Sequence, residues 1–494
     1  MRLRVAIIGS GIIGSCIARV LSMYENFSIT LIEREFDVGW GSSKANSSVI
    51  HPGHEEDPER HPLRAKLCKE GNILWRTWAK ELDIPVKWPG ELMLFFREEE
   101  RRARKYIDLA KRNGIPSVKI VPREELLKME PILNPDVEGA VYAPTTGVID
   151  PFEAVIAIVE NAVDNSVKLL TETEVRAIKI AGGQVKGALT NNGFVEADII
   201  INAAGIHSDE VSHMAGVEPN FKIRPRRGEY ILFDEDVEIK PTRVLHTTPT
   251  EKTKGVYGLT TIHGNLMIGP TAEDLPPDFK ERTSTTNEGL EYLWDKAKAL
   301  FKELPPRSKV IRSFAGLRAE PPDGRWLIRA YTDPWGFINV AGIRSPGFTA
   351  APAIAHYVLN LIRTEYDVKL IKKDRWNPYR RGIVRLADKS LHQIDSLIRK
   401  NPDYGEIICY CKLVSKAEIL EAIERMRKIG VKTITLDGIK HRTRAGFGRC
   451  QGAFCRWKIA LLVSEYAQIP LHKVVIKKSP YGIGDVKVLL RGDK

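Results

Sequence analysis

The sequence predicts an α/β fold followed by a small helical domain, and three observations lead to this prediction. A short β-rich run over residues 3–8 is followed at once by a glycine turn and by a run with helical periodicity over 15–23. Two further apolar runs, 197–205 and 336–347, also end in glycine. Near the C-terminus, four cysteines stand in two pairs beside segments of helical periodicity.

Length and composition indicate a folded protein of several domains. The chain has 494 residues, more than one hydrophobic core normally organises. Apolar residues make up 43% and charged residues 28%, and no apolar run approaches the roughly 20 residues that span a bilayer. Glycines punctuate the apolar N-terminal run, so we interpret it as a strand and turn and not as a signal peptide. Six cysteines are too few for a secreted disulfide scaffold, so we expect a cytoplasmic protein without a transmembrane segment.

The positive charge is concentrated near the C-terminus. The chain carries a net charge of +12, and residues 401–494 hold 18 Lys and Arg against 9 Asp and Glu. A surface that binds nucleic acid would add an aromatic-studded strand or a recognition helix, and neither pattern accompanies the charge. We therefore expect no nucleic-acid partner. Positive charge here would offset an anionic cofactor or steer an acidic redox partner.

The glycine turn has the spacing of a dinucleotide site. Gly9, Gly11 and Gly14 follow the first strand directly and open the helical run. The first glycine allows the tight turn, the second lets a pyrophosphate approach the backbone, and the third lets helix pack on strand. The helix N-terminus would stabilise the phosphate charge. A second apolar strand, Ser28–Ile32, ends in Glu33, where a carboxylate can bind the ribose hydroxyls.

The turn alone fits either NAD or FAD, and the rest of the chain favours FAD. The polar, glycine-flanked stretch 41–53 suits a loop that passes along a pyrophosphate towards a flavin ring. The strands over 197–205 and 336–347 end in small residues, where backbone can approach a dinucleotide, and a helical run over 349–362 follows. Three glycine-ended strands separated by long insertions indicate one nucleotide-binding domain that is interrupted twice.

These segments resemble the FAD-dependent D-amino-acid-oxidase-like superfamily, and within it the glycerol-3-phosphate dehydrogenase and 2-hydroxyglutarate oxidase branches. The shared segments are GSGIIG with Glu33, SSK…IHPG at 42–53, INAAG at 201–205, RRGEY at 226–230, FAGLRAE at 314–320 and GIRSPG at 342–347. The resemblance covers residues 1 to about 365. It implies a Rossmann-like FAD-binding domain with an interleaved antiparallel-sheet substrate domain. The implied FAD-binding segments are about 1–90, 145–220 and 325–365, and the substrate-domain segments about 91–144 and 221–324.

The resemblance also implies that FAD binds in an extended form, with its adenine near Val175 and its flavin near the turn that begins at Gly342. The expected FAD-binding residues are Gly9, Gly11, Ile12, Ile13, Gly14, Glu33, Arg34, Ser42, Ser43, Lys44, Asn46, Ser47, Val175, Ala204, Gly205, Gly342, Ile343, Gly347, Phe348 and Thr349.

Members of this type pass hydride from an alcohol carbon to the flavin, while arginines hold an anionic substrate. His51 matches the position beside the flavin and is the first candidate to accept the hydroxyl proton. Arg318 is the candidate anchor for a substrate carboxylate or phosphate, because a guanidinium forms paired hydrogen bonds to either. Tyr230, Arg344 and His263 are further catalytic candidates.

The flavin turn leaves the substrate open. Glycerol-3-phosphate enzymes carry a Lys-Thr-Thr pattern there, whereas this chain has Arg344-Ser-Pro-Gly. Our leading hypothesis is oxidation of glycerol 3-phosphate to dihydroxyacetone phosphate. A 2-hydroxy-acid or amino-acid dehydrogenase of the same architecture is the alternative, as is an electron-transfer subunit whose partner holds the substrate site.

The four C-terminal cysteines form a candidate metal site. Cys409 and Cys411 are followed, after 38 intervening residues, by Cys450 and Cys455. Four thiolates can hold zinc or a [2Fe-2S] cluster, and zinc usually prefers C-x2-4-C pairs with a shorter spacer between them. Ser415 is expected to cap one helix between the pairs, and residues 456–466 to form another. The two remaining cysteines, Cys16 and Cys68, are expected to pack as small apolar residues.

Residues of about 404–470, including GRCQGAFC at 448–455, resemble the bacterioferritin-associated-ferredoxin-like [2Fe-2S] domain. Such a domain is found fused to the large subunit of anaerobic glycerol-3-phosphate dehydrogenases. The resemblance implies that electrons leave the flavin through the cluster. It also implies a hetero- or homo-oligomer with a further redox subunit or a membrane-associated acceptor. Such a partner would hold the chain at the inner face of the membrane. Residues 366–403 would be a linker and 471–494 a tail.

Five basic residues surround the second cysteine pair. Two interpretations are open for them: a solvated surface, or a surface that stabilises the anionic cluster or docks an acceptor subunit. The five residues are Arg442, Arg444, Arg449, Arg456 and Lys458.

Overall fold

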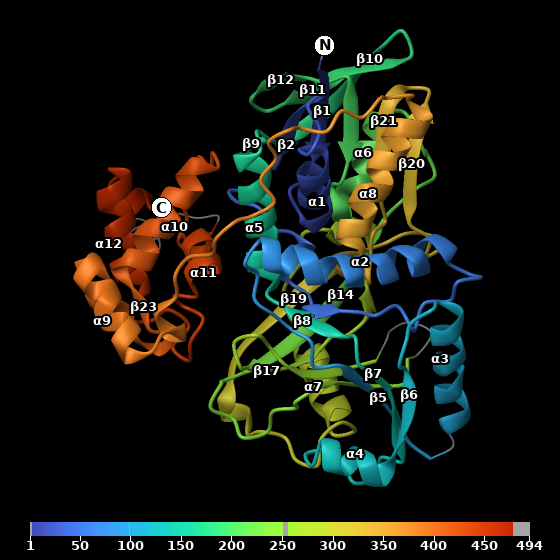
Figure 1. Ribbon diagram of the computed structural model, residues 1–494, viewed down its shortest axis with the longest axis vertical. Coiled ribbons are helices and arrows are strands. Elements are labelled where there is room, and N and C mark those ends of the chain that lie inside the picture. Colours follow the sequence, from blue (N-terminus) through green and yellow to red (C-terminus); the bar gives the residue numbers. More distant parts are fainter. Residues whose placement is uncertain (1, 98, 250–254, 478–494) are drawn as a thin grey trace, which may run out of the picture.

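The computed structural model describes residues 2–97, 99–249 and 255–477. Two large sheets lie one above the other in Figure 1, and a body of short helices that begins near residue 391 lies to one side of them. Within the described part of the chain, no helix is long and apolar enough to cross a membrane. We call this helical part, from about residue 391 onward, the C-terminal body.

The first sheet has nine strands and a parallel centre. Its main order is β10-β11-β21-β13-β1-β2-β9, with β12 beside β11 and β20 beside β21. The strands β21, β13, β1, β2 and β9 run parallel, so their carboxyl ends meet at one edge. The bounds are β1 Leu3–Ile8, β2 Phe27–Ile32, β9 Lys168–Leu170, β10 Val175–Ala181, β11 Gln184–Thr190, β12 Gly193–Glu196, β13 Ile199–Asn202, β20 Leu327–Thr332 and β21 Trp335–Ala341.

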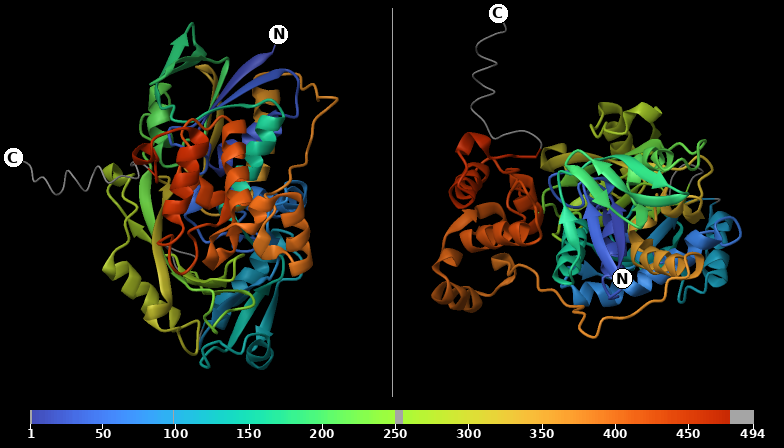
Figure 2. Two further views of the ribbon diagram at one scale, coloured as in Figure 1. Left: turned by 90° about the vertical axis from the view of Figure 1, so that its left-hand side faces the viewer. Right: turned by 90° about the horizontal axis from the view of Figure 1, so that it is seen from above.

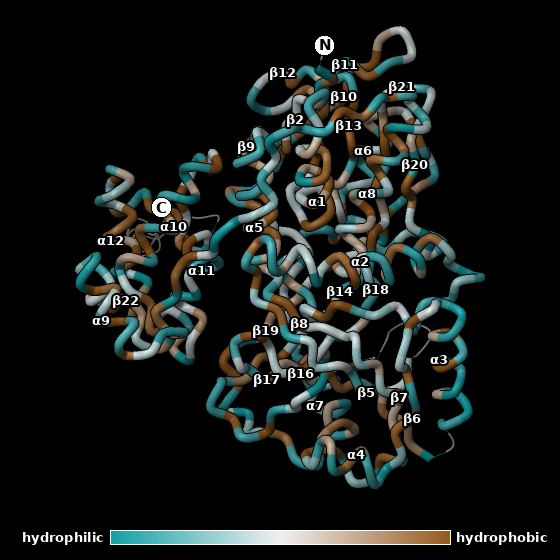
Figure 3. The backbone as a smooth tube through the Cα atoms, viewed as in Figure 1, coloured by the Kyte–Doolittle hydropathy of each residue, from teal (hydrophilic) through white to brown (hydrophobic). Residues whose placement is uncertain are grey.

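Helices pack over this sheet and against one another. The helix α1 (Ile12–Leu21) is largely hydrophobic (Figure 3) and packs against both α8 (Gly347–Glu365) and α5 (Pro151–Asp164). The long helix α2 (Pro62–Glu81) packs in turn on α8. Nearly every residue of α1 is buried, and its apolar side chains belong to one hydrophobic core with those of α5 and α8. The short helix α6 is Ser208–Met214.

The second sheet also has nine strands and is almost entirely antiparallel. Its order is β18-β14-β17-β16-β15-β5-β7-β6, with β19 beside β14, and among the described strands only β15 and β5 pair in parallel. The bounds are β5 Glu91–Phe95, β6 Lys119–Pro122, β7 Gly139–Ala143, β14 Arg224–Phe233, β15 Val244–Thr247, β16 Tyr257–Thr260, β17 Leu266–Gly269, β18 Glu273–Asp274 and β19 Val310–Glu320.

The two sheets draw on alternating parts of the chain, and this confirms the predicted α/β fold with an interleaved antiparallel sheet. A small sheet of β3 (Val49–Ile50), β8 (Gly147–Ile149) and β4 (Val86–Lys87) lies where the chain passes between them. Helices α3 (Glu100–Arg112), α4 (Arg123–Met129) and α7 (Asn287–Ala297) flank the second sheet (Figure 1).

The C-terminal body is helical, as predicted. Ser415 caps α10 in a capping box with Glu418, whose carboxylate accepts the Ser415 amide at 2.8 Å. The buried face of α10 includes Ile419, Ile423 and Met426. The elements are α9 Leu391–Lys400, β22 Ile407–Cys409, β23 Val414–Ser415, α10 Lys416–Lys428, α11 Leu436–Thr443 and α12 Arg456–Ala467.

The segment expected to be a linker is packed along the first part of the chain. Arg380 is buried between Glu153 and Glu160, with nitrogen-to-oxygen distances of 2.6 and 2.7 Å. Trp376 donates its indole N–H to the Ser22 hydroxyl at 3.1 Å. Arg380 and Trp376 thus bind to α5 and to the residue after α1. They fix the segment that leads to the C-terminal body (Figure 2).

Buried ion pairs join the C-terminal body to the nucleotide-binding part. The Arg442 side chain is 1% exposed, and its two terminal nitrogens donate to the Asp37 carboxylate oxygens at 2.5 and 3.0 Å. Arg444 pairs with Asp150, whose other oxygen caps α5. The interpretation of Arg442 and Arg444 as solvated or partner-docking residues is therefore wrong. Their acidic partners lie hundreds of residues away, and both basic residues connect the two parts of the chain.

We predict that Arg442→Ala destabilises the protein strongly, because it leaves Asp37 buried without its counter-charge. Breaking a buried ion pair from one side costs about 3–5 kcal/mol. The matched control is Arg399→Ala, which removes an exposed Arg–Asp pair within α9 and is expected to cost under about 1 kcal/mol. Urea unfolding of both variants checks this, and equal midpoints would contradict the assigned role of Arg442.

Candidate functional site

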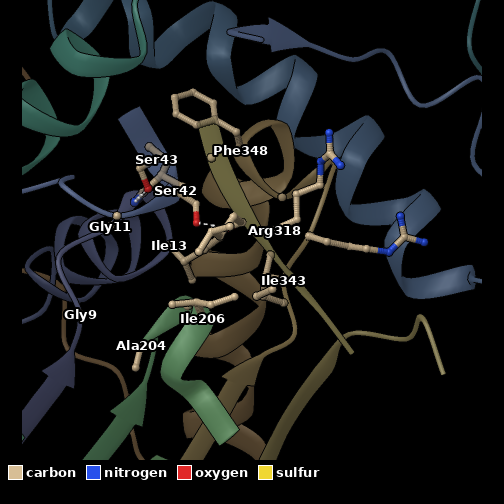
Figure 4. Close-up of a pocket in the computed structure, with 18 of the residues that line it drawn as sticks. Gly9, Gly11, Ile13, Ser42, Ser43, Ala204, Ile206, Arg318, Ile343 and Phe348 are labelled. Carbon is tan, nitrogen blue, oxygen red and sulfur yellow. Dashed lines mark hydrogen bonds between the residues drawn. The ribbon is translucent and has the colours of Figure 1, made fainter. Parts of the chain in front are cut away.

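The predicted dinucleotide residues gather around one cavity, which we call the first cavity. It begins at the carboxyl end of β2, passes the glycine turn, and ends beside the N-terminus of α8. Figure 4 shows Gly9 and Gly11 on one side of it, and Ile343, Phe348 and Arg318 on another. Ligands of open α/β sheets bind at this edge, outside the carboxyl ends of the parallel strands.

In the glycine turn, backbone atoms approach one another so closely that no side chain would fit between them. Gly9 has a φ of +102°, and a Cβ atom there would meet the Ala203 carbonyl oxygen at 2.5 Å. A Cβ on Gly14 would meet the Gly9 carbonyl oxygen at 2.0 Å. Helix α1 begins at Ile12, inside the motif, and not at residue 15 as the periodicity predicted. The helix N-terminus therefore opens directly on the first cavity, which suits a pyrophosphate.

Polar side chains organise the turn. Glu33 accepts hydrogen bonds from the Ser10 amide at 2.9 Å and from the Ser10 hydroxyl at 2.7 Å. The Ser43 hydroxyl accepts the Ile12 amide at 2.9 Å, so it occupies one of the free N–H groups of the first turn of α1. The loop that carries Ser43 lies tightly on β19, since a Cβ on Gly316 would meet the Ala45 carbonyl oxygen at 2.0 Å.

Most residues expected to bind FAD line the first cavity. Gly14 and Gly342 do not: Gly14 packs against the turn, and a Cβ on Gly342 would meet Pro321 at 2.8 Å. Lys44 faces elsewhere, with its ammonium 4.8 Å from the centre of the Trp40 ring. The expected residues that line the cavity are Gly9, Gly11, Ile12, Ile13, Glu33, Arg34, Ser42, Ser43, Asn46, Ser47, Val175, Ala204, Gly205, Ile343, Gly347, Phe348 and Thr349.

His51 lies at the α8 end of the first cavity. Its amide donates to the Thr349 hydroxyl at 2.9 Å, and its carbonyl accepts the Asn72 side-chain amide at 3.1 Å. The imidazole stands edge-on to the ring of Tyr257, with 6.2 Å between centroids. The backbone of His51 is thus held on two sides, which fixes where its ring can reach. Burial raises the pKa of Tyr257 well above its usual value, so this phenol stays neutral.

Arg318 enters the same region from β19. Its Nη2 donates to the Thr271 carbonyl at 3.1 Å, and it forms an ion pair with none of the acidic side chains that the structure describes. Gly228, on the neighbouring strand, leaves the room that this guanidinium needs, since a Cβ there would meet Nη2 at 2.6 Å. Tyr230 lies beside Arg318, stacks on Phe314 at 4.8 Å, and has its pKa raised by burial.

Arg344 and Arg226 also line the first cavity, but carboxylates neutralise them. Arg344 pairs with Glu320 at 3.0 Å, and burial lowers its pKa. Arg226 pairs with Asp274 at 2.6 Å and lies 3.4 Å from Glu320. Three residues of the cavity wall were not among the predicted catalytic residues: Arg226, Glu320 and Tyr257. The alternation along β14 could have found Arg226, because residues 226, 228 and 230 share one face of the strand.

His263 is not brought to the first cavity. It lines a second cavity, where its Nε2 lies 2.9 Å from an Asp150 oxygen. Burial is the largest of the effects that lower its pKa, to about 4. An imidazole in that state is neutral near pH 7, and here it supports the carboxylate that also caps α5.

The four C-terminal cysteines come together in two pairs. The Sγ atoms of Cys411 and Cys450 lie 3.4 Å apart. A hydrogen bond from the Cys455 thiol is the main cause that lowers the pKa of Cys409 to about 6. Across the described residues, no group of three or more His, Cys, Asp or Glu side chains is arranged to hold a single metal ion. Two thiol pairs instead fit a [2Fe-2S] cluster, in which each iron takes two cysteines.

The second cavity lies between the C-terminal body and the two sheets. It shares Ser42, Asn46 and Leu317 with the first cavity, and on its other side it reaches Cys411. Residues next to the cysteines hold this contact: Lys412 pairs with Glu235, and Arg449 with Asp234 at 3.3 Å. The cysteine loops therefore face the same loop and strand that line the first cavity.

We predict that Gly14→Ala lowers the FAD content of the purified protein at least ten-fold, because the added methyl group pushes α1 away from the turn. The matched control is Gly41→Ala, since Gly41 lines the same cavity but a Cβ there meets nothing within 4 Å. Absorbance of the flavin released on denaturation gives the ratio of FAD to chain. Full FAD content in Gly14→Ala would contradict the packing role.

Comparison with known proteins agrees with this geometry. Residues 4–361 match the family model described as FAD dependent oxidoreductase, and residues 407–465 match the BFD-like [2Fe-2S] binding domain. The chain is 38% identical to a "Glycerol 3-phosphate dehydrogenase" of Caloramator mitchellensis, over 95% of each protein. It is 26% identical to the "Anaerobic glycerol-3-phosphate dehydrogenase subunit A1" of Haloferax volcanii, over 94% of this chain and 83% of that protein.

A solved structure shows the same fold. The chain superposes on the dithionite-reduced L-alpha-glycerophosphate oxidase of Mycoplasma pneumoniae with FAD bound, with a TM-score of 0.70 and 30% identity, covering 77% of this chain and 98% of that one. The predictions of FAD and of a [2Fe-2S] cluster as cofactors are confirmed. The chain therefore belongs to the FAD-dependent oxidoreductase family and carries a BFD-like [2Fe-2S] domain at its C-terminal end.

Proposed function

We propose that the protein oxidises sn-glycerol 3-phosphate to dihydroxyacetone phosphate and passes the electrons from FAD to the [2Fe-2S] cluster. The observation that carries this proposal is Arg318, a cavity-lining guanidinium without a carboxylate partner among the described residues. Such a group is suited to an anionic substrate, and its fork matches a phosphate. Relatives named for glycerol 3-phosphate support this choice of substrate.

Each side chain in the proposed mechanism has a separate task. FAD, when bound, supplies the hydride acceptor that alcohol oxidation requires. Arg318 holds the substrate phosphate, with Tyr230 beside it as a neutral hydrogen-bonding group. His51 accepts the proton of the substrate hydroxyl, because a neutral imidazole is a suitable base near pH 7. Arg344 and Arg226 form part of the wall of the first cavity. Their charges are neutralised by Glu320 and Asp274.

The cysteine loops provide the exit for electrons in this proposal. The second cavity connects Cys411 with the loop 42–46, which also borders the first cavity. We also propose that the chain works in a multi-subunit redox complex, because one relative is named as a subunit. Such a complex would receive electrons from the cluster and could hold this chain at the inner face of the membrane.

The direct test is an anaerobic titration of the purified protein with substrates, followed by flavin absorbance and by the electron paramagnetic resonance of the reduced cluster. We expect glycerol 3-phosphate to bleach the flavin first and to reduce the cluster afterwards. L-2-hydroxyglutarate and amino acids should leave both centres oxidised. Reduction by 2-hydroxyglutarate alone would replace our proposal by the 2-hydroxy-acid alternative.

We predict that Arg318→Ala raises the KM for glycerol 3-phosphate at least a hundred-fold, which corresponds to about 2.7 kcal/mol. Arg318→Lys should recover only part of this, because an ammonium keeps the charge but not the fork. The control Arg325→Ala removes an exposed guanidinium that pairs with Asp323, and should leave KM unchanged. Steady-state reduction of a small dye measures all three. An unchanged KM in Arg318→Ala would remove Arg318 from the substrate site.

A further inference from the structure

Large apolar side chains are exposed around the cysteine loops. Tyr410 is 71% exposed, Phe454 71%, Trp457 50% and Leu461 45%. Tyr410 stands between Cys409 and Cys411, and Phe454 directly precedes Cys455. We call these four residues, together with Lys458, the aromatic patch.

Lys458 joins the first cysteine loop to α12. The Lys458 ammonium lies 5.3 Å from the centre of the Tyr410 ring and 5.8 Å from that of Trp457. Trp457 and Leu461 are four residues apart on α12, so they share one face of the helix. The patch therefore connects the first cysteine loop with the first two turns of α12.

Helix α12 carries apolar residues on two faces. One face, with Ile459, Ala460 and Val463, is buried in the C-terminal body. The other face carries Trp457 and Leu461, which stay about half exposed in the described chain, at 50% and 45%. An exposed apolar face on a helix that already buries another apolar face is typical of a contact surface. Figures 1 and 2 show α12 on the outer side of the C-terminal body, away from the two sheets.

We propose that the aromatic patch is the docking surface for a redox protein whose contact surface has an apolar centre and an acidic rim. This inference rests on the proposed function, in which electrons leave through the cluster. Aromatic residues are enriched at protein interfaces and exposed apolar patches mark them. The position of the patch also supports a redox partner. A protein that binds over Tyr410 and Phe454 touches residues next to three of the cysteine ligands.

The basic residues around the patch indicate that the partner has acidic residues at the edge of its contact surface. Lys458 lies within the patch, and exposed Arg456 begins α12 beside it. Residues 401–494 carry twice as many basic as acidic side chains. With Arg442 and Arg444 neutralised inside the fold, Arg456 and Lys458 are basic groups that remain available beside the cysteines. Acidic residues on the partner would complement them and speed association.

An anionic lipid surface could also attract basic and aromatic residues. The position of the patch favours a protein, because Tyr410 and Phe454 belong to the loops that carry the cysteines. Lipid alone brings no electron acceptor to the cluster. The experiment below separates the two.

We test the inference with the double variant Trp457→Ser/Leu461→Ser, which removes apolar area without changing the charge. The matched control is Leu391→Ser, because Leu391 is 85% exposed on α9 of the same body. The holoenzyme is reduced with glycerol 3-phosphate. Its electrons are then offered to ferricyanide, to an acidic b-type cytochrome, and to a basic c-type cytochrome.

We expect the wild-type protein and Leu391→Ser to reduce the acidic cytochrome with a higher kcat/KM than the basic one, and to lose this preference at high salt. The double variant should lose at least ten-fold in kcat/KM for the acidic cytochrome and nothing for ferricyanide. Lys458→Glu should also lower the rate with the acidic cytochrome. Direct binding of the oxidised acidic cytochrome, measured by calorimetry, should weaken in parallel.

Three results would overturn the inference. The first is a double variant that binds and reduces the acidic cytochrome as the wild type does. The second is a wild-type preference for the basic cytochrome. The third is sedimentation with phosphatidylglycerol vesicles that is lost in the double variant, which would assign the patch to lipid. Failure of glycerol 3-phosphate to reduce the flavin is a different result, and it would count against the proposed function itself.

Discussion

The close backbone contact between α1 and the glycine turn is the constraint on which the remaining structure depends. Helix α1 can lie on the turn only because Gly14 has no side chain to separate it from the Gly9 carbonyl. The same helix packs against α8, whose first turn borders the first cavity, and against α5, whose cap residue Asp150 pairs with Arg444. A shift of α1 would therefore move the cofactor site and the attachment of the C-terminal body together.

Local patterns were sufficient to predict much of the fold. The glycine spacing with Glu33, the cysteine spacing and the capping position at Ser415 all depend on residues close in sequence, where chain geometry limits the outcomes. The start of α1 was placed three residues too late, because periodicity does not show that a helix begins within its own glycine motif. The recurrence of glycine-ended strands predicted a nucleotide-binding domain that is interrupted twice, and the family resemblance implied the interleaved antiparallel sheet.

Long-range pairs were not predictable in this way. Arg442 and Arg444 were read from their neighbours in sequence, but Asp37 and Asp150 decide their environment. His263 was a catalytic candidate from its local segment, whereas in the fold its imidazole lies beside Asp150. Neutralisation of Arg226 and Arg344 by Glu320 and Asp274 likewise needs the register of β14, β18 and β19, which no single segment specifies.

The paired strands β14 and β19 have a mechanical consequence. One end of this ribbon carries Arg226 and Arg318, while its other end leads to Asp234, which holds Arg449 beside Cys450. A strand advances about 3.3 Å per residue and is stiffened by its ladder of hydrogen bonds. The ribbon thus keeps a fixed distance between the arginines of the first cavity and the loop that carries Cys450. An insertion within either strand would change that spacing.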